Sequence, residues 1–275
     1  MSDKRIAGYP STEVSLQSIQ IDASYQRGRE ERHVARIAKT FDQDQFRPPL
    51  CVRRTDDSLF CIDGQQRVLG ARDAGYTHVW ATVIPSEGVE REAWLFVLAN
   101  EGTQKVDAQF KHKARLVWGE PVALKIEKVL NSYGLTGTPN GSHEVRAITA
   151  LRNCWTNPDN PKPGDLVAGG ACLEWVVGAL AGQYGDGARR SRDVYQADPI
   201  NALAWLYRNA PDNPPLHEVV TKLAEVGPGY LHEVITGHKW STGGSLSQAY
   251  GLNLGRWLGW AWVQEKLSQL GKKAA

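Results

Sequence analysis

The spacing of hydrophobic residues changes once along this chain, close to residue 121. Before that point, short apolar runs of strand length alternate with segments whose apolar residues recur every three or four positions. Beyond it the strand pattern almost vanishes and the helical spacing continues. A chain of 275 residues is long enough to bury two separate cores. We therefore expect a mixed α/β domain over residues 12–120 and an all-α domain over residues 121–275.

The first domain is expected to build a sheet around one hairpin. Two strands flank the turn sequence TDDS, whose Asp and Ser residues are typical of turns. A helical pattern starts directly after the second strand and ends at Gly75, a natural left-handed cap. The expected strands are residues 14–21, 49–54, 59–63 and 78–85, and the expected helices are residues 29–42, 64–76, 87–102 and 108–134, the last broken near Gly119.

The second domain combines helical spacing with links rich in Pro, Gly, Asn and Asp. We expect helices at residues 143–155, 171–183, 198–209, 215–225, 228–236 and 245–270. Seven of the ten tryptophans lie here, and the last helix is expected to place Trp257 and Trp260 on one face and Trp262 elsewhere. Core packing is the first interpretation of these three residues, and an interface with a partner or a second copy is the alternative. The segment WSTGGSLSQ lacks the ending of a phosphate-binding P-loop, so Ser245 is expected to cap a helix.

Composition excludes few classes of protein. The net charge of +2 does not indicate a nucleic-acid binder, so any such surface would be a local patch. No apolar run is long enough for a transmembrane helix, and the N-terminus has no signal-peptide core. The four cysteines form no metal-binding spacing. We expect them to be reduced and buried, in a cytoplasmic protein.

The stretch CIDGQQR raises the sharpest functional question. A short buried strand ends at Asp63, and a helical pattern begins directly after Gly64. Glycine lets the backbone approach a ligand, and the free N–H groups of a first helical turn attract an anion. Arg67 presents a planar fork to phosphate oxygens, while Asp63 is placed to cap the helix, hold a metal ion or accept a proton. The ordinary alternative is a helix cap at Asp63 and a surface salt bridge at Arg67.

The longer stretch CIDGQQRVLGARDAGY resembles the signature of the ParB/sulfiredoxin superfamily: a strand, a G-x-x-R turn, a helix and a closing glycine. The preceding order of a lead strand, a YQR segment, a helix and a hairpin matches the ParB N-terminal domain. Downstream, ANEGTQKVDAQFKHKA is similar to that family's second nucleotide motif. The resemblance covers about residues 12–118. The DGQQR form, which is close to DGQHR, and the helical tail resemble uncharacterised ParB-like proteins of phages.

The resemblance implies that this protein binds a nucleotide. Sulfiredoxins use a cysteine in this turn, and no cysteine lies between Gly64 and Arg67, so sulfinic-acid repair is not expected. ParB proteins bind CTP and DNA and often carry a dimerising tail, and another branch transfers the γ-phosphate of ATP to a hydroxyl group. We therefore expect a phage protein, in the host cytoplasm, that binds ATP or CTP with Mg²⁺ and hydrolyses or transfers the γ-phosphate. Expected partners are the nucleotide, DNA and a second copy of the chain, with no membrane.

The same resemblance assigns binding and catalytic roles to individual residues. The phosphates are expected to contact Gly64, Gln65, Gln66 and Arg67, and the rest of the nucleotide to contact Arg27, Asn100, Gln104 and Lys105. Asp63, with Glu101, is expected to act in catalysis, with Asp63 holding the metal ion. A plain helix end at Gly102 and solvent exposure of the glutamines are the ordinary alternatives.

Two other functions remain open from the sequence. Residues Arg189, Arg190 and Arg192 lie in a Gly-rich loop that suits contacts with a DNA backbone, although a solvated loop explains them as well. If these residues contact DNA, the chain is expected to be a non-enzymatic DNA-binding adaptor. The weaker alternative is a nuclease, which would need several convergent carboxylates that the sequence does not show.

Overall fold

The computed structural model describes residues 9–43, 46–101, 106–139, 143–156, 166–184, 195–212, 214–225, 228–237 and 245–274. The chain divides into two compact units, Met1–Glu120 and Pro121–Ala275. We call them the N-terminal unit and the helical unit and describe each by itself. The division falls at the residue where the hydrophobic spacing changes.

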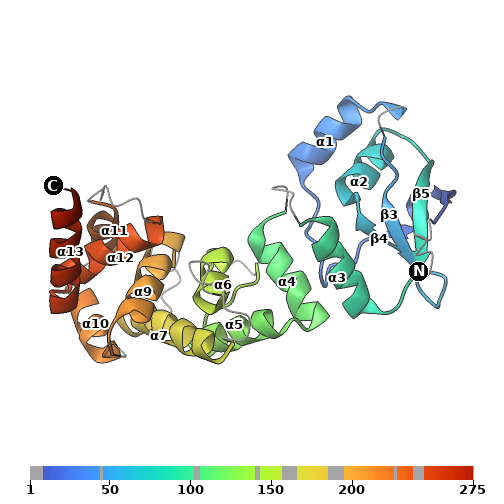
Figure 1. Ribbon diagram of the computed structural model, residues 1–275. Coiled ribbons are helices and arrows are strands. Elements are labelled where there is room, and N and C mark those ends of the chain that lie inside the picture. The colour runs from blue at the N-terminus through green and yellow to red at the C-terminus, as the bar shows by residue number, and fades with distance from the viewer. Residues whose placement is uncertain are drawn as a thin grey trace, which may run out of the picture. The chain divides into compact units, whose positions relative to one another are not determined.

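The N-terminal unit contains a five-stranded mixed sheet with the order β1-β5-β3-β4-β2 (Figure 1). Strand β1 pairs antiparallel with β5, β5 parallel with β3, β3 antiparallel with β4, and β4 parallel with β2. The hairpin of β3 and β4 and the strand β5 confirm three of the expected strands. The strands are β1 (Ser11–Ser15), β2 (Ile19–Gln20), β3 (Leu50–Arg53), β4 (Leu59–Asp63) and β5 (His78–Pro85).

The expected single strand at residues 14–21 is wrong, because a 3₁₀ turn at Leu16–Ser18 divides it into β1 and β2. These two strands form opposite edges of the sheet. Four strand spacings measure about 19 Å, whereas the chain from Ser15 to Ile19 can span at most about 14 Å. The sheet must therefore curl until its edges approach each other. Ser18 Oγ stabilises the turn by donating a 2.8 Å hydrogen bond to the carbonyl of Ser15.

Helices cover both faces of this curled sheet. On one face, residues of α2 pack against the strands in a core that includes Cys51, Cys61 and Val68. On the other face, α3 and α4 contribute to a core that includes Val52, Ile62 and Phe96. The helices are α1 (Glu31–Lys39), which packs on α2, α2 (Gln65–Asp73), α3 (Val89–Ala99) and α4 (Ala108–Trp118).

Two glycines end helices where the sequence predicts. Gly75 has a φ of 86°, and the N–H of Tyr76 donates to the carbonyl of Ala71 at 3.1 Å, which closes α2. Gly119 has a φ of 83° and ends α4, so the expected break near this residue is confirmed. The first position of the next helix is then taken by Pro121, where a missing N–H costs little.

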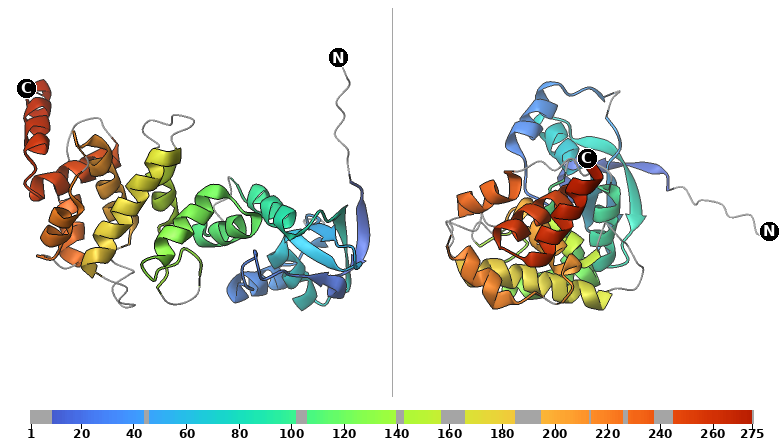
Figure 2. Two further views of the ribbon diagram at one scale, coloured as in Figure 1. Left: turned by 90° about the horizontal axis from the view of Figure 1, so that it is seen from below. Right: turned by 60° about the vertical axis from the view of Figure 1, so that its left-hand side comes forward.

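The elements assigned in the helical unit are all helices, apart from an isolated bridge between Thr136 and Glu144 (Figure 2). Helix α9 contacts α6, α7, α11 and α12, so it lies at the centre of this core. The all-α expectation is confirmed. The helices are α5 (Pro121–Asn131), α6 (Ile148–Thr156), α7 (Leu166–Tyr184), α9 (Ala197–Asn209), α10 (Leu216–Leu223), α11 (Pro228–Thr236), α12 (Leu246–Trp257) and α13 (Ala261–Ala274).

The expected single helix at residues 245–270 is wrong. Gly259 adopts a φ of 78°, and the N–H of Trp260 donates to the carbonyl of Gly255 at 3.2 Å, which ends α12 and lets α13 begin in a new direction. Trp262 stacks on Trp205 of α9 with ring centroids 6.0 Å apart, and lies 6.2 Å from the Trp260 ring. Core packing therefore accounts for Trp262. The cap at Ser245 is confirmed, because its side chain accepts from the N–H of Gln248.

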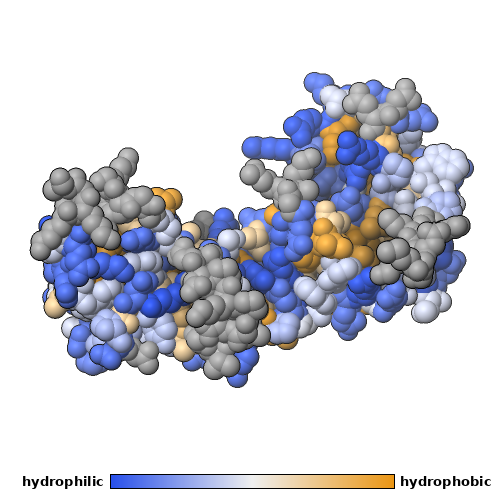
Figure 3. Space-filling view, in the orientation of Figure 1, coloured by the Kyte–Doolittle hydropathy of each residue, from blue (hydrophilic) through white to orange (hydrophobic). Residues whose placement is uncertain are grey.

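Hydrophilic residues cover much of the N-terminal unit in the view of Figure 3, while apolar residues show over α3, where Leu98 is 50% exposed. Charged side chains such as Arg32 and Arg36 account for the polar surface of α1. Among the described helices, none combines the length and the apolar character that crossing a bilayer requires.

The close packing of α1 on α2 generates a first prediction. A methyl group at Gly70 would lie 2.8 Å from Cβ of Ile37, so we expect Gly70→Ala to lower the free energy of unfolding by about 1–3 kcal/mol. Helix propensity alone favours alanine by up to about 1 kcal/mol. A decrease in the free energy of unfolding therefore indicates the steric clash with Ile37. Urea denaturation followed by circular dichroism measures it. Gly28→Ala, where no atom lies within 4 Å, is the control, and equal stability of both variants would contradict the packing.

Candidate functional site

The turn between β4 and α2 has the geometry expected of an anion-binding turn. Gly64 has φ 93° and ψ 15°, a left-handed conformation that favours glycine. A Cβ atom at this position would lie 2.8 Å from Nη2 of Arg67 and 3.1 Å from Cβ of Pro49. Glycine is thus required twice, for the backbone conformation and for the close approach of the guanidinium group.

The N-terminus of α2 has no side-chain cap. Within the described residues, the N–H groups of Gln65, Gln66 and Arg67 donate to no acceptor, and the first such bond in α2 is from Val68 to the carbonyl of Gly64. Asp63 does not cap the helix, because its carboxylate contacts Arg67 instead. Free N–H groups and the helix dipole together favour a negatively charged ligand at this end.

Arg67 lies over the same turn. Its Nη2 donates to Asp63 Oδ2 at 3.0 Å and its Nη1 to the carbonyl of Arg47 at 3.0 Å. The Asp63 side chain is 44% exposed and that of Arg67 29% exposed, and exposed pairs of this kind contribute only about 0–1 kcal/mol. The surface salt bridge considered as the ordinary alternative therefore exists, but it is weak enough for an anion to compete for the guanidinium group.

The side chains of Gln65 and Gln66 turn toward the segment before α1 and do not lie free at the turn. Both side chains are buried, so the alternative of solvent exposure is wrong for them. Gln65 Nε2 donates to the carbonyl of Arg27 at 2.8 Å, and Gln66 Nε2 donates to that of Gly28 at 3.2 Å. Gln66 Oε1 also accepts from the N–H of Glu30 at 3.1 Å. The side-chain amides thus bind the segment before α1, while the backbone N–H groups of the first turn of α2 stay available to a ligand.

The segment held in this way carries Arg27, whose guanidinium pairs with Glu30. It also carries Gln26, which the sequence analysis did not single out. Gln26 is 2% exposed and its amide nitrogen donates to the carbonyl of Cys61 in β4. Its amide oxygen has no hydrogen-bond partner among the described residues. The residue's place in the YQR segment, directly before Arg27, is the only sequence signal for this contact.

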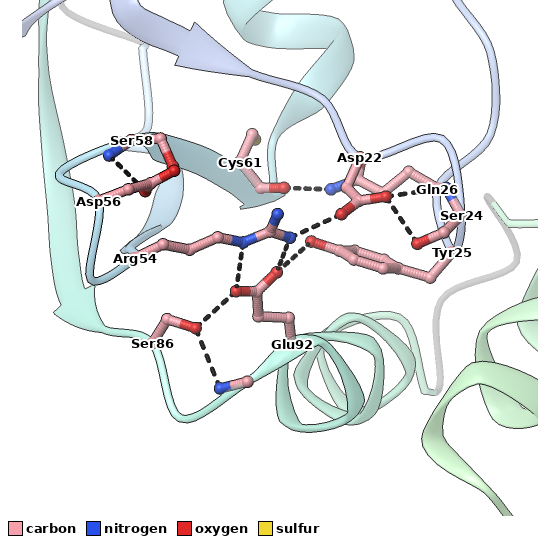
Figure 4. A network of polar contacts seen from close by, with 11 residues as sticks. Asp22, Ser24, Tyr25, Gln26, Arg54, Asp56, Ser58, Cys61, Ser86 and Glu92 are labelled. Carbon is pink, nitrogen blue, oxygen red and sulfur yellow. Dashed lines mark hydrogen bonds and ion pairs between the residues drawn. The ribbon is translucent and has the colours of Figure 1, made fainter.

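A partly buried ionic network adjoins the same segment (Figure 4). Glu92 of α3 is fully buried and accepts from Arg54 Nε at 2.9 Å and from Arg54 Nη2 at 2.5 Å. The hydroxyls of Tyr25 and Ser86 donate to the same carboxylate at 3.1 Å and 2.6 Å. Arg54 Nη2 also donates to Asp22 Oδ2 at 2.6 Å. The network therefore joins residues 22–25 to the end of β3 and to α3.

The network holds its acids ionised. Burial alone would raise the pKa of Glu92, but hydrogen bonds from Arg54, Ser86 and Tyr25 outweigh it and the pKa is lowered. The pKa of Asp22 is lowered in the same way: burial opposes, while bonds from Ser24 and Arg54 prevail. Burial and the Glu92 charge raise the pKa of Tyr25, so its hydroxyl stays a donor. No sequence pattern connects the parts of this network, because residues 22–25, Arg54 and residues 86–92 lie far apart along the chain.

The second predicted motif is only partly described. Asn100 is buried at the end of α3, where its Nδ2 donates to the carbonyl of Phe96 at 2.7 Å. Glu101 is exposed, and its Oε1 accepts from Arg115 Nη2 at 3.5 Å. No contact between Glu101 and Asp63 occurs in the described part of the chain. The predicted residues Gln104, Lys105, Arg189, Arg190 and Arg192 lie outside the described residues.

For a metal ion at this turn, the candidate protein ligand is the carboxylate of Asp63. Asp63 Oδ2 bonds to Arg67, and Oδ1 has no partner among the described residues. These residues contain no group of three or more His, Cys, Asp or Glu side chains placed to hold a metal ion. Such an arrangement fits Mg²⁺ held by one carboxylate together with ligand phosphates and water. It fits a two-metal nuclease site poorly.

Comparisons with known proteins give distant likenesses only. No protein-family model matches the sequence, and no curated protein matches it either. Among solved structures, the C-terminally truncated chromosome-partitioning protein ParB from Caulobacter crescentus, complexed to the centromeric parS site, has 14% identity and a TM-score of 0.34, covering 78% of this chain and 100% of that chain. A Pnob8-like ParB-N domain has 11% identity and a TM-score of 0.35, covering 96% and 98%. Such values assign neither a family nor an activity.

The network generates a second prediction. We expect Glu92→Gln to lower the free energy of unfolding at pH 7 by about 3 kcal/mol, because Arg54 loses its buried counter-charge. The lowered pKa values of Glu92 and Asp22 mean that their contribution is present above the ordinary value of 4.5 for Glu92 and is lost as pH falls through the folded-state values. The difference between the variant and the wild type should therefore shrink in acid.

Urea denaturation at pH 7 and at successively lower pH values measures this difference. The matched control is Glu90→Gln, an exposed acid on the same helix, which should change stability by less than about 0.5 kcal/mol. A constant difference between wild type and Glu92→Gln from neutral to acid pH would show that the carboxylate is not held ionised by the fold.

Proposed function

We propose that the N-terminal unit binds a nucleoside triphosphate, ATP or CTP, with Mg²⁺ at the Gly64 turn, and that it hydrolyses the γ-phosphate or transfers it to an acceptor in a DNA-related process of a phage. One observation carries the proposal: the uncapped start of α2 presents three N–H groups without an acceptor beside Arg67. The resemblance of the DGQQR turn to ParB-like sequences supports the choice of ligand.

The proposed roles follow from the contacts. Phosphate oxygens accept from the N–H groups of Gln65, Gln66 and Arg67, and the guanidinium of Arg67 turns from Asp63 to the phosphates. That exchange leaves the Asp63 carboxylate without a counter-charge. A cation bound to the phosphates then takes the place of the guanidinium group beside Asp63. Mg²⁺ supplies charge neutralisation of the phosphate oxygens when bound.

The remaining roles depend on segments on either side of the turn. The carbonyls of Arg27 and Gly28 are fixed by Gln65 and Gln66, so a nucleotide seated on the turn lies near a rigid segment. We propose that Arg27 and Asn100, with Gln104 and Lys105, contact the nucleotide. Glu101 is proposed to assist Asp63, after release from Arg115. These residues act by position and charge, as phosphoryl transfer requires.

The second candidate is a non-enzymatic DNA-binding adaptor. Phosphates of a DNA backbone are anions of the same kind, and helix N-termini bind them in protein–DNA complexes. The ion pair between Asp63 and Arg67 favours this function, because it engages the carboxylate that catalysis at the turn would use. Arg189, Arg190 and Arg192 are proposed as further phosphate contacts, and a second copy of the chain as a partner. A nuclease has less support, since the described residues contain no group of three or more His, Cys, Asp or Glu side chains placed to hold a metal ion.

Calorimetric titration with ATP, CTP, GTP and UTP in the presence of Mg²⁺ tests the main proposal. We expect one nucleotide to bind, and Arg67→Ala to weaken that binding by about 10–100-fold through loss of charge-assisted hydrogen bonds. The matched control is Arg53→Ala, which removes another arginine from an i,i+4 ion pair, with Asp57 at 2.9 Å. Arg53 lies at the hairpin end of β3, opposite Leu59 rather than Asp63, so its loss should not change the affinity.

Titration with duplex DNA and the variant Asp63→Ala separates the two candidates. Loss of phosphate release or transfer in Asp63→Ala, with retained nucleotide binding, supports the enzyme. Retained DNA binding in Asp63→Ala and no binding of any nucleotide, with or without DNA, contradicts the enzyme and supports the adaptor.

A further inference from the structure

Helix α1 carries three cations on its outer face (Figure 1). The helix packs on α2 through a face that includes Val34 and Ile37. Successive residues of an α-helix lie about 100° apart around its axis, so Arg32, Arg36 and Lys39 fall within about 60° of one another, nearly opposite that face. All three are exposed. We call these three residues the basic stripe.

The acids at the start of α1 do not neutralise the basic stripe. Glu30 and Glu31 are each paired with an arginine that precedes the helix. Arg36 Nη2 donates to Nδ1 of His33 at 2.9 Å, and this partner carries no negative charge. In the described part of the chain, no carboxylate pairs with any residue of the stripe. Three positive charges are therefore gathered on one helix face of a protein whose net charge is only +2.

The length of the basic stripe fits a regular row of phosphates. Seven residues of helix measure about 10 Å, and each strand of B-DNA carries one phosphate about every 3.4 Å along the axis. Three cations thus face about three successive phosphates of one strand. The small exposed residue beside Arg32 and Arg36 is Ala35. The stripe therefore has no aromatic ring for the bases of a single strand and no acceptor for a ribose 2′-hydroxyl, which favours duplex DNA.

An anionic membrane fits this surface less well. Helices that bind a membrane surface bury an apolar face in it. The apolar face of α1 already packs on α2, where Val34 is fully buried and Ile37 lies against Gly70. The face that α1 presents to solvent consists of charged and small side chains, so it offers no apolar surface for insertion.

We propose that the basic stripe of α1 binds the phosphate backbone of duplex DNA, independently of the base sequence. Each of the three cations contacts a phosphate and displaces bound counterions. Contacts of this kind position a protein on DNA and do not read its bases. Because the stripe lies on α1 and not at the Gly64 turn, it binds DNA whether or not a nucleotide occupies the turn.

Fluorescence anisotropy of a short labelled duplex of arbitrary sequence, measured over a series of salt concentrations, tests the proposal. Each phosphate contact adds about 0.9 to the slope of log K against log salt concentration. For the stripe variant Arg32→Gln, Arg36→Gln, Lys39→Gln, we expect a slope smaller by about 2–3 and an affinity weaker on the order of 100-fold at about 0.1 M salt. Arg32→Lys with Arg36→Lys keeps the charges and should retain the wild-type slope.

The matched control removes the same charge from exposed cations outside α1, with Arg53→Gln, Lys128→Gln and Lys222→Gln. Both triple variants lose three positive charges, which changes the net charge from +2 to −1. The control should keep the wild-type slope, because salt screens charges that lie far from the bound strand. Nucleotide calorimetry should give the same result for the stripe variant as for the wild type, which separates this proposal from the proposed function.

Equal affinity and equal salt dependence of the stripe variant and the wild type would overturn the proposal, as would an equal loss in the control. Failure of the wild type to bind duplex DNA at about 50 mM salt would also overturn it. So would binding to phosphatidylserine vesicles, or to duplex RNA, without binding to duplex DNA. If circular dichroism shows less helix in the stripe variant, the single variant Arg32→Gln provides the second measurement, with a slope smaller by about 0.9.

Discussion

The buried carboxylate of Glu92 is the constraint on which the N-terminal unit depends. A charge removed from water must be neutralised and hydrogen-bonded where it lies, or the fold loses several kcal/mol. Here the guanidinium of Arg54 provides two donors, and the hydroxyls of Tyr25 and Ser86 provide two more. The three donor residues come from three different segments of the chain. Satisfying one carboxylate therefore fixes the end of β3, the start of α3 and the segment that precedes α1 in a single arrangement.

That arrangement extends to the candidate site through a series of amides. Gln26 follows Tyr25 and bonds to β4, while Gln65 and Gln66 of α2 bond to the carbonyls that follow Gln26. The segment is thus held both by the sheet and by α2. Because the glutamine side chains are occupied in this way, the first turn of α2 keeps its backbone N–H groups for a ligand. A rigid framework with an uncapped helix start is what an anion site needs, since little ordering accompanies binding.

Local patterns predicted most of the elements and failed where a long-range contact decided the outcome. The strands at 59–63 and 78–85 and the cap at Gly75 follow from residues close in sequence, and the structure agrees. The strand expected at 14–21 fails because the curled sheet needs its two halves on opposite edges. The helix expected at 245–270 fails at Gly259, where packing of Trp262 on Trp205 favours a new helix axis.

The sequence by itself determined the two-unit division, the Gly64 turn and the position of Arg67 in the first helical turn, because hydrophobic period and glycine conformation act over a few residues. Only the tertiary structure decided the partners. It paired Arg67 with Asp63, turned Gln65 and Gln66 toward the backbone, and joined Arg54 to Glu92. Such contacts depend on how strands and helices stack in space, and a buried polar group takes whichever partner that stacking places within hydrogen-bonding distance.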